Sequence, residues 1–204
     1  MSPERWLDLM AALGIGEHRE MFRRVHDAYS EPHRHYHTVA HIDACLREFD
    51  SCRTLARFAH EVEAALWFHD VIYAPRATDS ESRSADLAKQ FVASAGVPPE
   101  ACARVHNHIM ATMHNAEPAD PDSALVVDVD LSILGQDAAA YDVFEAQVRK
   151  EYQWVPGIVF RRKRAAILRS FLERGSIYST PQFRERYEAA ARANLQRAIE
   201  RLGR

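Results

Sequence analysis

The chain has 204 residues, 47% of them hydrophobic, which is enough to bury a sizeable core in one domain. No apolar run approaches the roughly 18 residues of a membrane span, and three cysteines without a CxxC pair argue against a disulfide framework or a thiolate zinc site. A net charge of −3 conceals a basic stretch over residues 149–204, with 14 Arg or Lys against 5 Asp or Glu. Because the two signs are interleaved there, we interpret it as solvated helix faces and expect no obligate nucleic-acid partner.

The amino terminus has no basic segment followed by an apolar core, so the sequence gives no secretion signal and predicts a cytoplasmic location. No linker-like stretch divides the chain. We therefore expect a single domain over residues 1–204, with Cys45, Cys52 and Cys102 as small core or surface residues.

Start and stop signals and apolar stripes predict about ten helices and no convincing strand, hence an all-α bundle. Residues 124–135 would also fit a strand by periodicity, but a lone strand would have nothing to pair with. The expected helices cover about residues 3–13, 17–29, 42–50, 53–71, 80–95, 99–112, 124–135, 137–152, 158–174 and 181–202.

We expect the chemistry in the front half of the chain, because all eleven histidines lie between His18 and His114. His37 and His41 are four apart, a spacing that puts two imidazoles on one face of a helix. His69 and Asp70 end an apolar run over residues 64–68, which would carry them into the interior. Burying such a pair costs several kcal/mol unless it is compensated, and a metal ion would compensate it.

The potential ligands are these histidines, Asp70 and one aspartate of the later Asp128-x-Asp130 segment. Mixed nitrogen and oxygen donors suit Mn, Fe, Ni, Zn or Mg and leave positions open to water. Residues two apart on a helix face differently, so only one of the two late aspartates is expected to reach the ion.

This pattern resembles the HD-domain superfamily of all-α, metal-dependent phosphohydrolases, and more fully a group of uncharacterised bacterial proteins described as predicted HD phosphohydrolases. The resemblance implies that His41, His69, Asp70 and Asp130 bind the metal, with Asp70 also counted among the catalytic residues. It prefers Asp130 because the family places its last aspartate just before an Arg-Leu or similar pair, and Asp130 followed by Leu131 fits that loosely. The segments that carry it are Arg34-His35-Tyr36-His37-Thr38, Trp67-Phe68-His69-Asp70-x-x-Tyr73, Asp128-x-Asp130-Leu131-Ser132-Ile133-Leu134-Gly135 and Glu188-x-x-Ala191-Arg192-x-Asn194-Leu195.

A second likeness concerns Tyr36-His37-x-x-x-His41, which is similar to the Tyr-His-Asn-x-x-His segment of cyclic nucleotide phosphodiesterases. It implies that His37 protonates the leaving oxygen while His41 binds metal, although Thr38 stands where those enzymes have Asn. Imidazole suits general acid catalysis near neutral pH. The alternative that His37 is itself a ligand stays open.

Four other residues are weaker candidates for substrate binding. Glu81 could bond a metal water or be an ordinary first-turn glutamate. His108 and His114 could hold a second metal or a phosphate, or be ordinary helix-end and loop histidines. Arg164 is our choice from a basic run to hold an anionic substrate.

The expected activity is hydrolysis of a phosphomonoester, nucleotide or cyclic nucleotide by a metal-bound water. One alternative is a di-iron oxygenase, a chemistry that some HD-domain proteins use, and it would need further histidine ligands. The other is a non-catalytic ligand-binding domain that keeps a metal for stability. The sequence indicates no oligomeric state.

Overall fold

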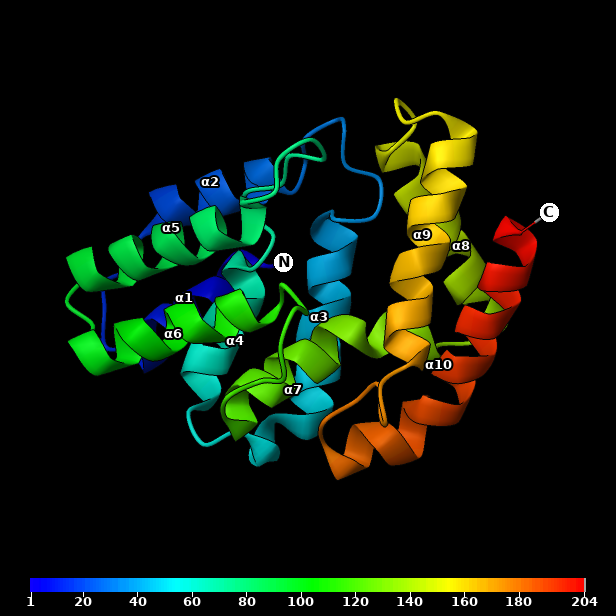
Figure 1. The fold of residues 1–204 in the computed structure, drawn as a ribbon. Coiled ribbons are helices and arrows are strands. Elements are labelled where there is room, and N and C mark those ends of the chain that lie inside the picture. Colours follow the sequence, from blue (N-terminus) through cyan, green and yellow to red (C-terminus); the bar gives the residue numbers. More distant parts are fainter. Residues whose placement is uncertain (204) are drawn as a thin grey trace. The chain divides into compact units, whose positions relative to one another are not determined.

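The computed structural model describes residues 1–203, and within them all regular structure is helical, which confirms the all-α class (Figure 1). Two short 3-10 helices, η1 (Arg53–Leu55) and η2 (Leu131–Gly135), accompany ten α-helices. The α-helices are α1 (Pro3–Ala12), α2 (Arg19–Ala28), α3 (Val39–Cys52), α4 (Ala59–Phe68), α5 (Ser80–Ser94), α6 (Pro99–Ala111), α7 (Pro121–Asp130), α8 (Ala138–Glu151), α9 (Gly157–Leu172) and α10 (Pro181–Leu202). No helix among the described residues is long and apolar enough to cross a membrane.

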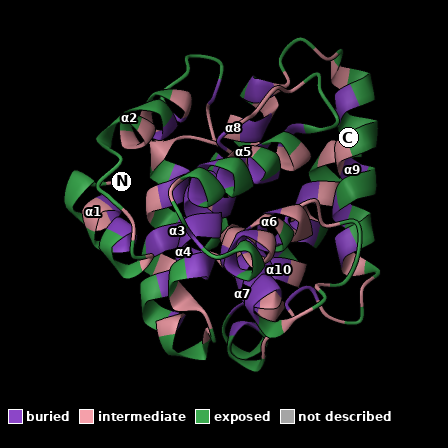
Figure 2. Cartoon of the chain, turned by 90° about the vertical axis from the view of Figure 1, so that its left-hand side faces the viewer, coloured by how far each residue is buried: buried purple, intermediate pink, exposed green. Residues whose placement is uncertain are grey.

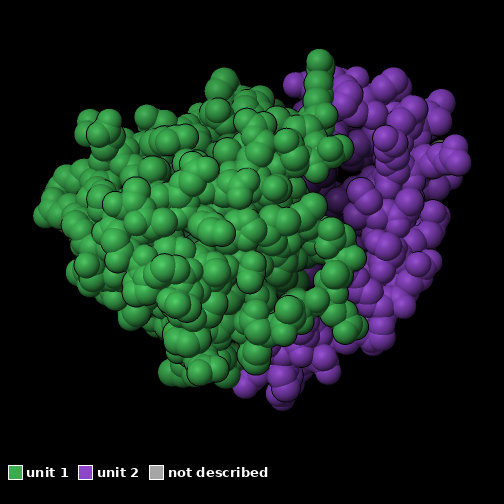
Figure 3. All heavy atoms as spheres, turned by 60° about the vertical axis from the view of Figure 1, so that its left-hand side comes forward, with its two compact units in different colours: residues 1–130 green, residues 131–204 purple. Residues whose placement is uncertain are grey.

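The chain forms two compact units, residues 1–130 and residues 131–204, which Figure 3 distinguishes by colour. A division by packing does not by itself mark a domain boundary, so the single domain stays a prediction. Every residue of the predicted metal site belongs to the first unit, and Arg164 belongs to the second.

Helix α4 is the centre of the first unit. It contacts α1, α3, α5, α6 and α7, while α5 and α6 lie side by side (Figure 1). All residues from Glu61 to Phe68 are buried, and Figure 2 shows this helix in the colour of the interior. A helix that is buried on every face lies inside the core. Its carboxyl end, which leads into His69 and Asp70, is therefore held firmly.

The predicted start of this helix at residue 53 was wrong. Residues 53–55 form η1, Leu55 is exposed, and the backbone of Ala56 is extended, so α4 begins only at Ala59. The carboxylate of Asp122 accepts the backbone N–H groups of Arg57 and Phe58, each at 2.8 Å. Phe58 is the N-cap of α4 and Arg57 the residue before it, so a distant side chain fixes the backbone where the helix begins.

Other boundaries agree with local signals. Ser2 and Asp137 accept backbone N–H groups as the N-caps of α1 and α8, and Gly96 ends the α5 turn with a φ of 99°. These boundary signals come from residues next to the helix ends and are therefore local.

In the second unit, ion pairing of Arg164 with Glu145 and contact of Arg149 with the Phe160 ring join α8 and α9 as antiparallel neighbours.

The second unit also explains two of the late sequence motifs. A Cβ on Gly135 would lie 2.5 Å from the Cβ of Tyr187, so only glycine allows η2 to pack this closely on α10. Asn194 donates to the carbonyls of Leu134 and Gln136, at 2.9 and 2.8 Å. Both motifs therefore hold the start of this unit together.

Candidate metal centre

Three helix ends meet at the predicted site. His41 lies in the first turn of α3, His69 and Asp70 follow the last residue of α4, and Asp130 is the last residue of α7. The carboxyl ends of α4 and α7 each carry a partial negative charge, equivalent to about half an elementary charge, which favours a cation. The two helix dipoles and the two carboxylates therefore all favour a cation at this site.

The donor atoms converge closely. His41 Nε2 lies 3.2 Å from His69 Nε2, 3.5 Å from Asp70 Oδ2 and 3.3 Å from Asp130 Oδ1. His69 Nε2 lies 3.1 and 3.6 Å from the same two carboxylate oxygens. Sequence analysis therefore named four residues that the fold does bring together, and Asp130 is the late aspartate that faces both histidines.

These separations match a single ion. Donors about 2.1 Å from one ion lie about 3.0 Å apart at adjacent corners of an octahedron and about 3.4 Å apart in a tetrahedron. The five measured distances run from 3.1 to 3.6 Å. The buried set of His41, Cys45, His69 and Asp130 can hold a metal ion, since one donor atom from each lies within 4.8 Å of all the others.

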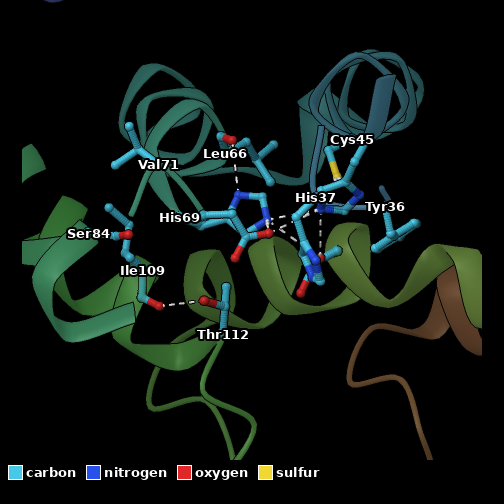
Figure 4. Close-up of polar contacts among 12 residues, drawn as sticks. Tyr36, His37, Cys45, Leu66, His69, Val71, Ser84, Ile109 and Thr112 are labelled. Atoms are coloured by element: carbon cyan, nitrogen blue, oxygen red, sulfur yellow. Dashed lines mark hydrogen bonds and ion pairs between the residues drawn. The ribbon is translucent and has the colours of Figure 1, made fainter. Parts of the chain in front are cut away.

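The tautomer of His69 is set by the backbone. Its Nδ1 lies 3.0 Å from the carbonyl oxygen of Leu66, which can only accept a hydrogen bond. The proton of the neutral ring therefore sits on Nδ1, and the lone pair of Nε2 faces the cluster, as in protein metal sites. Figure 4 shows His69 between the Leu66 carbonyl and the remaining side chains of the centre.

Without an ion, protons compensate the cluster. Burial lowers the pKa of His69, but Asp70 and Asp130 outweigh burial and raise it well above the usual 6.5. Burial likewise opposes the charges of the two aspartates, yet the neighbouring histidines hold the pKa of each well below 3.8. Because the histidines must be neutral to bind metal, an ion and protons compete here.

Two further side chains hold the segment that carries Asp70. Arg34 is 4% exposed and donates to the carbonyl oxygens of Asp70 at 2.6 Å and Val71 at 3.0 Å. The hydroxyl of Tyr29 donates to the Trp67 carbonyl and accepts the backbone N–H of Asp70. Sequence reasoning missed these roles, although Arg34 opens the first quoted motif.

His37 does not share a helix face with His41, so that prediction was wrong. The backbone of Thr38 is extended, with φ −115° and ψ 178°, and α3 begins only at Val39. The His37 ring instead stacks on Tyr73 at 4.3 Å between centroids and lies 5.9 Å from the His41 ring. It is half-buried beside Asp70, and its charge contributes to the lowered pKa of that aspartate.

The residue that does share a helix face with His41 is Cys45. Cys45 follows His41 by one turn of α3, is 2% exposed, and places Sγ 3.7 Å from Nδ1 and 3.8 Å from Nε2 of that ring. We had expected only a small core or surface residue. The spacing of four from His41 was the signal that would have found it.

The weaker candidates differ in whether they lie at the centre. His114 lies at the centre, with Nε2 3.1 Å from Asp130 Oδ2 and its backbone at φ 55°. Glu81 lies half-buried in the first turn of α5. The serines of that helix reach the segment after Asp70: Ser84 accepts the backbone N–H of Ile72, and Ser80 that of Ala74.

His108 and Arg164 have local structural partners. His108 is 1% exposed, and its Nδ1 lies 2.8 Å from the hydroxyl of Ser123. Ser123 is near the start of α7 and Asp130 at its end, about 10 Å along the helix axis. Burial lowers the pKa of His108, which keeps its ring neutral. Arg164 pairs with Glu145 at 2.5 Å in the second unit.

Comparison with known proteins adds no assignment: no protein-family model matches the chain, and no match was found among the curated proteins or the solved structures.

Proposed function

We propose that this chain is a divalent-metal-dependent phosphoric ester hydrolase acting on a phosphomonoester, a nucleotide or a cyclic nucleotide. Support comes from one observation above all, the convergence of His41, His69, Asp70 and Asp130 within 3.1 to 3.6 Å. The resemblance of the same residues to HD-domain phosphohydrolases supplies the reaction class.

The exposure of the carboxylates favours catalysis over a closed structural site. The side chains of Asp70 and Asp130 are 16% and 15% exposed, whereas those of His41 and His69 are 3% and 1% exposed. Solvent thus reaches the centre from the carboxylate side, and an open position is what a catalytic ion needs. A divalent ion bound here would activate a water molecule and offset charge on the phosphoryl oxygens.

In this proposal the protein residues bind the ion, position its ligands and donate a proton. His41, His69, Asp70 and Asp130 hold the ion, and Arg34 fixes the backbone of Asp70. His37 donates the proton to the leaving oxygen, which suits its half-exposed position beside Asp70. The metal is Mn, Fe, Ni, Zn or Mg, all of which accept imidazole or carboxylate donors.

The test combines elemental analysis with a phosphoester panel. Wild type, Asp70→Ala and the surface control Asp86→Ala are purified without added metal and then assayed with Mn²⁺, Fe²⁺, Ni²⁺, Zn²⁺ and Mg²⁺. We expect metal and hydrolysis in the wild type and control, and neither hydrolysis nor bound Mn²⁺ or Mg²⁺ in Asp70→Ala. If the wild type binds no metal under any loading condition, the proposal is wrong.

One observation favours a second candidate, a di-iron oxygenase. Asp130 directs Oδ1 toward His41 and Oδ2 toward His114, so its carboxylate has a histidine on each side. His114 and Asp130 would hold a second ion there. Two iron atoms per chain, with oxygen consumption and no phosphoester hydrolysis, would favour this function over the first.

A further inference from the structure

The three cysteines of this chain have different surroundings. Cys52 Sγ lies 3.4 and 3.5 Å from the backbone carbonyls of Glu48 and Phe49, and Cys102 Sγ lies 3.3 Å from that of Val97. These are ordinary contacts of a thiol inside or beside a helix. Cys45 differs, because its sulfur lies against the ring nitrogens of His41.

We infer that Cys45 is a ligand for thiophilic divalent ions, completing with His41, His69 and Asp130 a second donor set that overlaps the first. The inference rests on the metal centre of the proposed function. It goes beyond that function because the two sets differ in their fourth ligand, which is Asp70 in one and Cys45 in the other.

The geometry allows this exchange. The sulfur is 3.8 Å from His41 Nε2, and the four donor atoms of the set all lie within 4.8 Å of one another. Around a tetrahedral ion with a metal–sulfur bond of about 2.3 Å, sulfur lies about 3.6 Å from each nitrogen or oxygen ligand. The sulfur therefore has to approach by on the order of 1 Å, within reach of a rotation about the Cα–Cβ bond of one side chain.

The two fourth ligands favour different ions. A carboxylate oxygen suits Mg²⁺ and Mn²⁺, whereas a thiolate suits Zn²⁺, Cd²⁺ and Co²⁺. Binding through Cys45 breaks the S–H bond, forms a metal–sulfur bond and releases the proton to solvent. Asp70 would then be free of the ion, so the identity of the metal would decide which side chain closes the centre.

Cobalt provides a test that does not depend on enzyme activity. The full-length protein is stripped with chelator, loaded with Co²⁺ and examined by absorption spectroscopy, with bound Co²⁺ counted by elemental analysis. We expect a thiolate-to-cobalt charge-transfer band in the near ultraviolet for wild type. Cys52→Ser, a matched buried cysteine on the same helix, should keep the band, and Cys45→Ser should bind Co²⁺ without it.

A second measurement compares a soft ion with a hard one. Cys45→Ser should weaken Cd²⁺ binding by about tenfold to a hundredfold and change Mn²⁺ binding by less than about threefold. Asp70→Asn should show the reverse preference. If Cys45→Ser does not fold, Cys45→Ala and the wild-type spectrum still decide the question.

The outcomes separate this inference from the proposed function. One Co²⁺ per chain without a charge-transfer band in wild type would overturn the role of Cys45 and leave the histidine–aspartate centre standing. A band that survives in Cys45→Ser would also overturn it. No bound Co²⁺, Cd²⁺ or Mn²⁺ in wild type would overturn the centre itself and this inference with it.

Discussion

The candidate metal centre of the first unit and the Glu188 network of the second unit are both polar clusters, but their partners differ. In the second unit a carboxylate meets donors only: Glu188 accepts hydrogen bonds from the backbone N–H groups of Ile177 and Tyr178, the hydroxyl of Ser176 and Nε of Arg192. In the first unit, His69 Nε2 and the oxygens of two aspartates, which act as acceptors when the His69 ring is neutral, face one another beside His41 Nε2.

The difference distinguishes a structural polar cluster from a candidate ligand-binding site. A carboxylate surrounded by donors is satisfied, and it stabilises the fold without any ligand. Acceptors that face acceptors are satisfied only when a proton or a cation lies between them. The centre of the first unit is therefore satisfied by protons or by a cation, whereas the Glu188 network needs neither.

Replacing a ligand of the centre should have the largest effect. We expect His69→Ala to lose its metal and to lower the rate of phosphoester hydrolysis by about 10³-fold, because an ion contributes several kcal/mol to the transition state. Metal content and kcat/KM of purified protein check this. His106→Ala, which changes a partly exposed histidine of α6, should leave both unchanged.

Disrupting the Glu188 network should affect stability without affecting metal. Glu188→Ala leaves the amides of Ile177 and Tyr178 without their carboxylate, which should cost about 3 kcal/mol of unfolding free energy. Urea unfolding measures the loss, with the exposed Glu200→Ala as control. A fall in bound metal in Glu188→Ala would contradict this separation.

Metal removal should destabilise the first unit. With free ion at about one hundred times its dissociation constant, binding adds about 2.7 kcal/mol, which corresponds to a Tm shift of about 5 to 10 °C at this chain length. Calorimetry with and without chelator measures the shift. With Mn²⁺ as the ion, the same chelator should leave the Tm of Asp70→Ala unchanged.

The stabilisation by metal should grow as pH rises. In the metal-free protein the pKa values of His41 and His69 lie above 6.5, so their pairing with the aspartates stabilises fully below pH 6.5 and is lost as pH rises through the folded values. The aspartates, with pKa values lowered below 3.8, remain charged over this range. The metal-induced Tm shift should therefore be larger at pH 8 than at pH 6, and a shift that shrinks would be evidence against competition with protons.

Local signals were enough to predict most helix boundaries, and short motifs together with the family resemblance were enough to predict the four converging residues. Ser2, Asp137 and the glycines act through their own turns, and the motifs around His41, His69 and Asp130 are short. Local signals gave the wrong helix start where a distant residue determines the backbone conformation. Asp122, 64 residues from Phe58, fixes the start of α4, and no local pattern contains that contact.

The sequence by itself predicted that this chain is helical and that histidines and aspartates in its first 130 residues share one site, and the structure brings four of them together. Helix propensity, capping and apolar periodicity are properties of neighbouring residues, so they can be identified without the fold. Only the tertiary structure decided which groups share the site. His37 lies before the helix of His41, His108 contacts the start of α7, and Cys45 lies beside the His41 ring. A packed core sets these distances, and chain spacing does not.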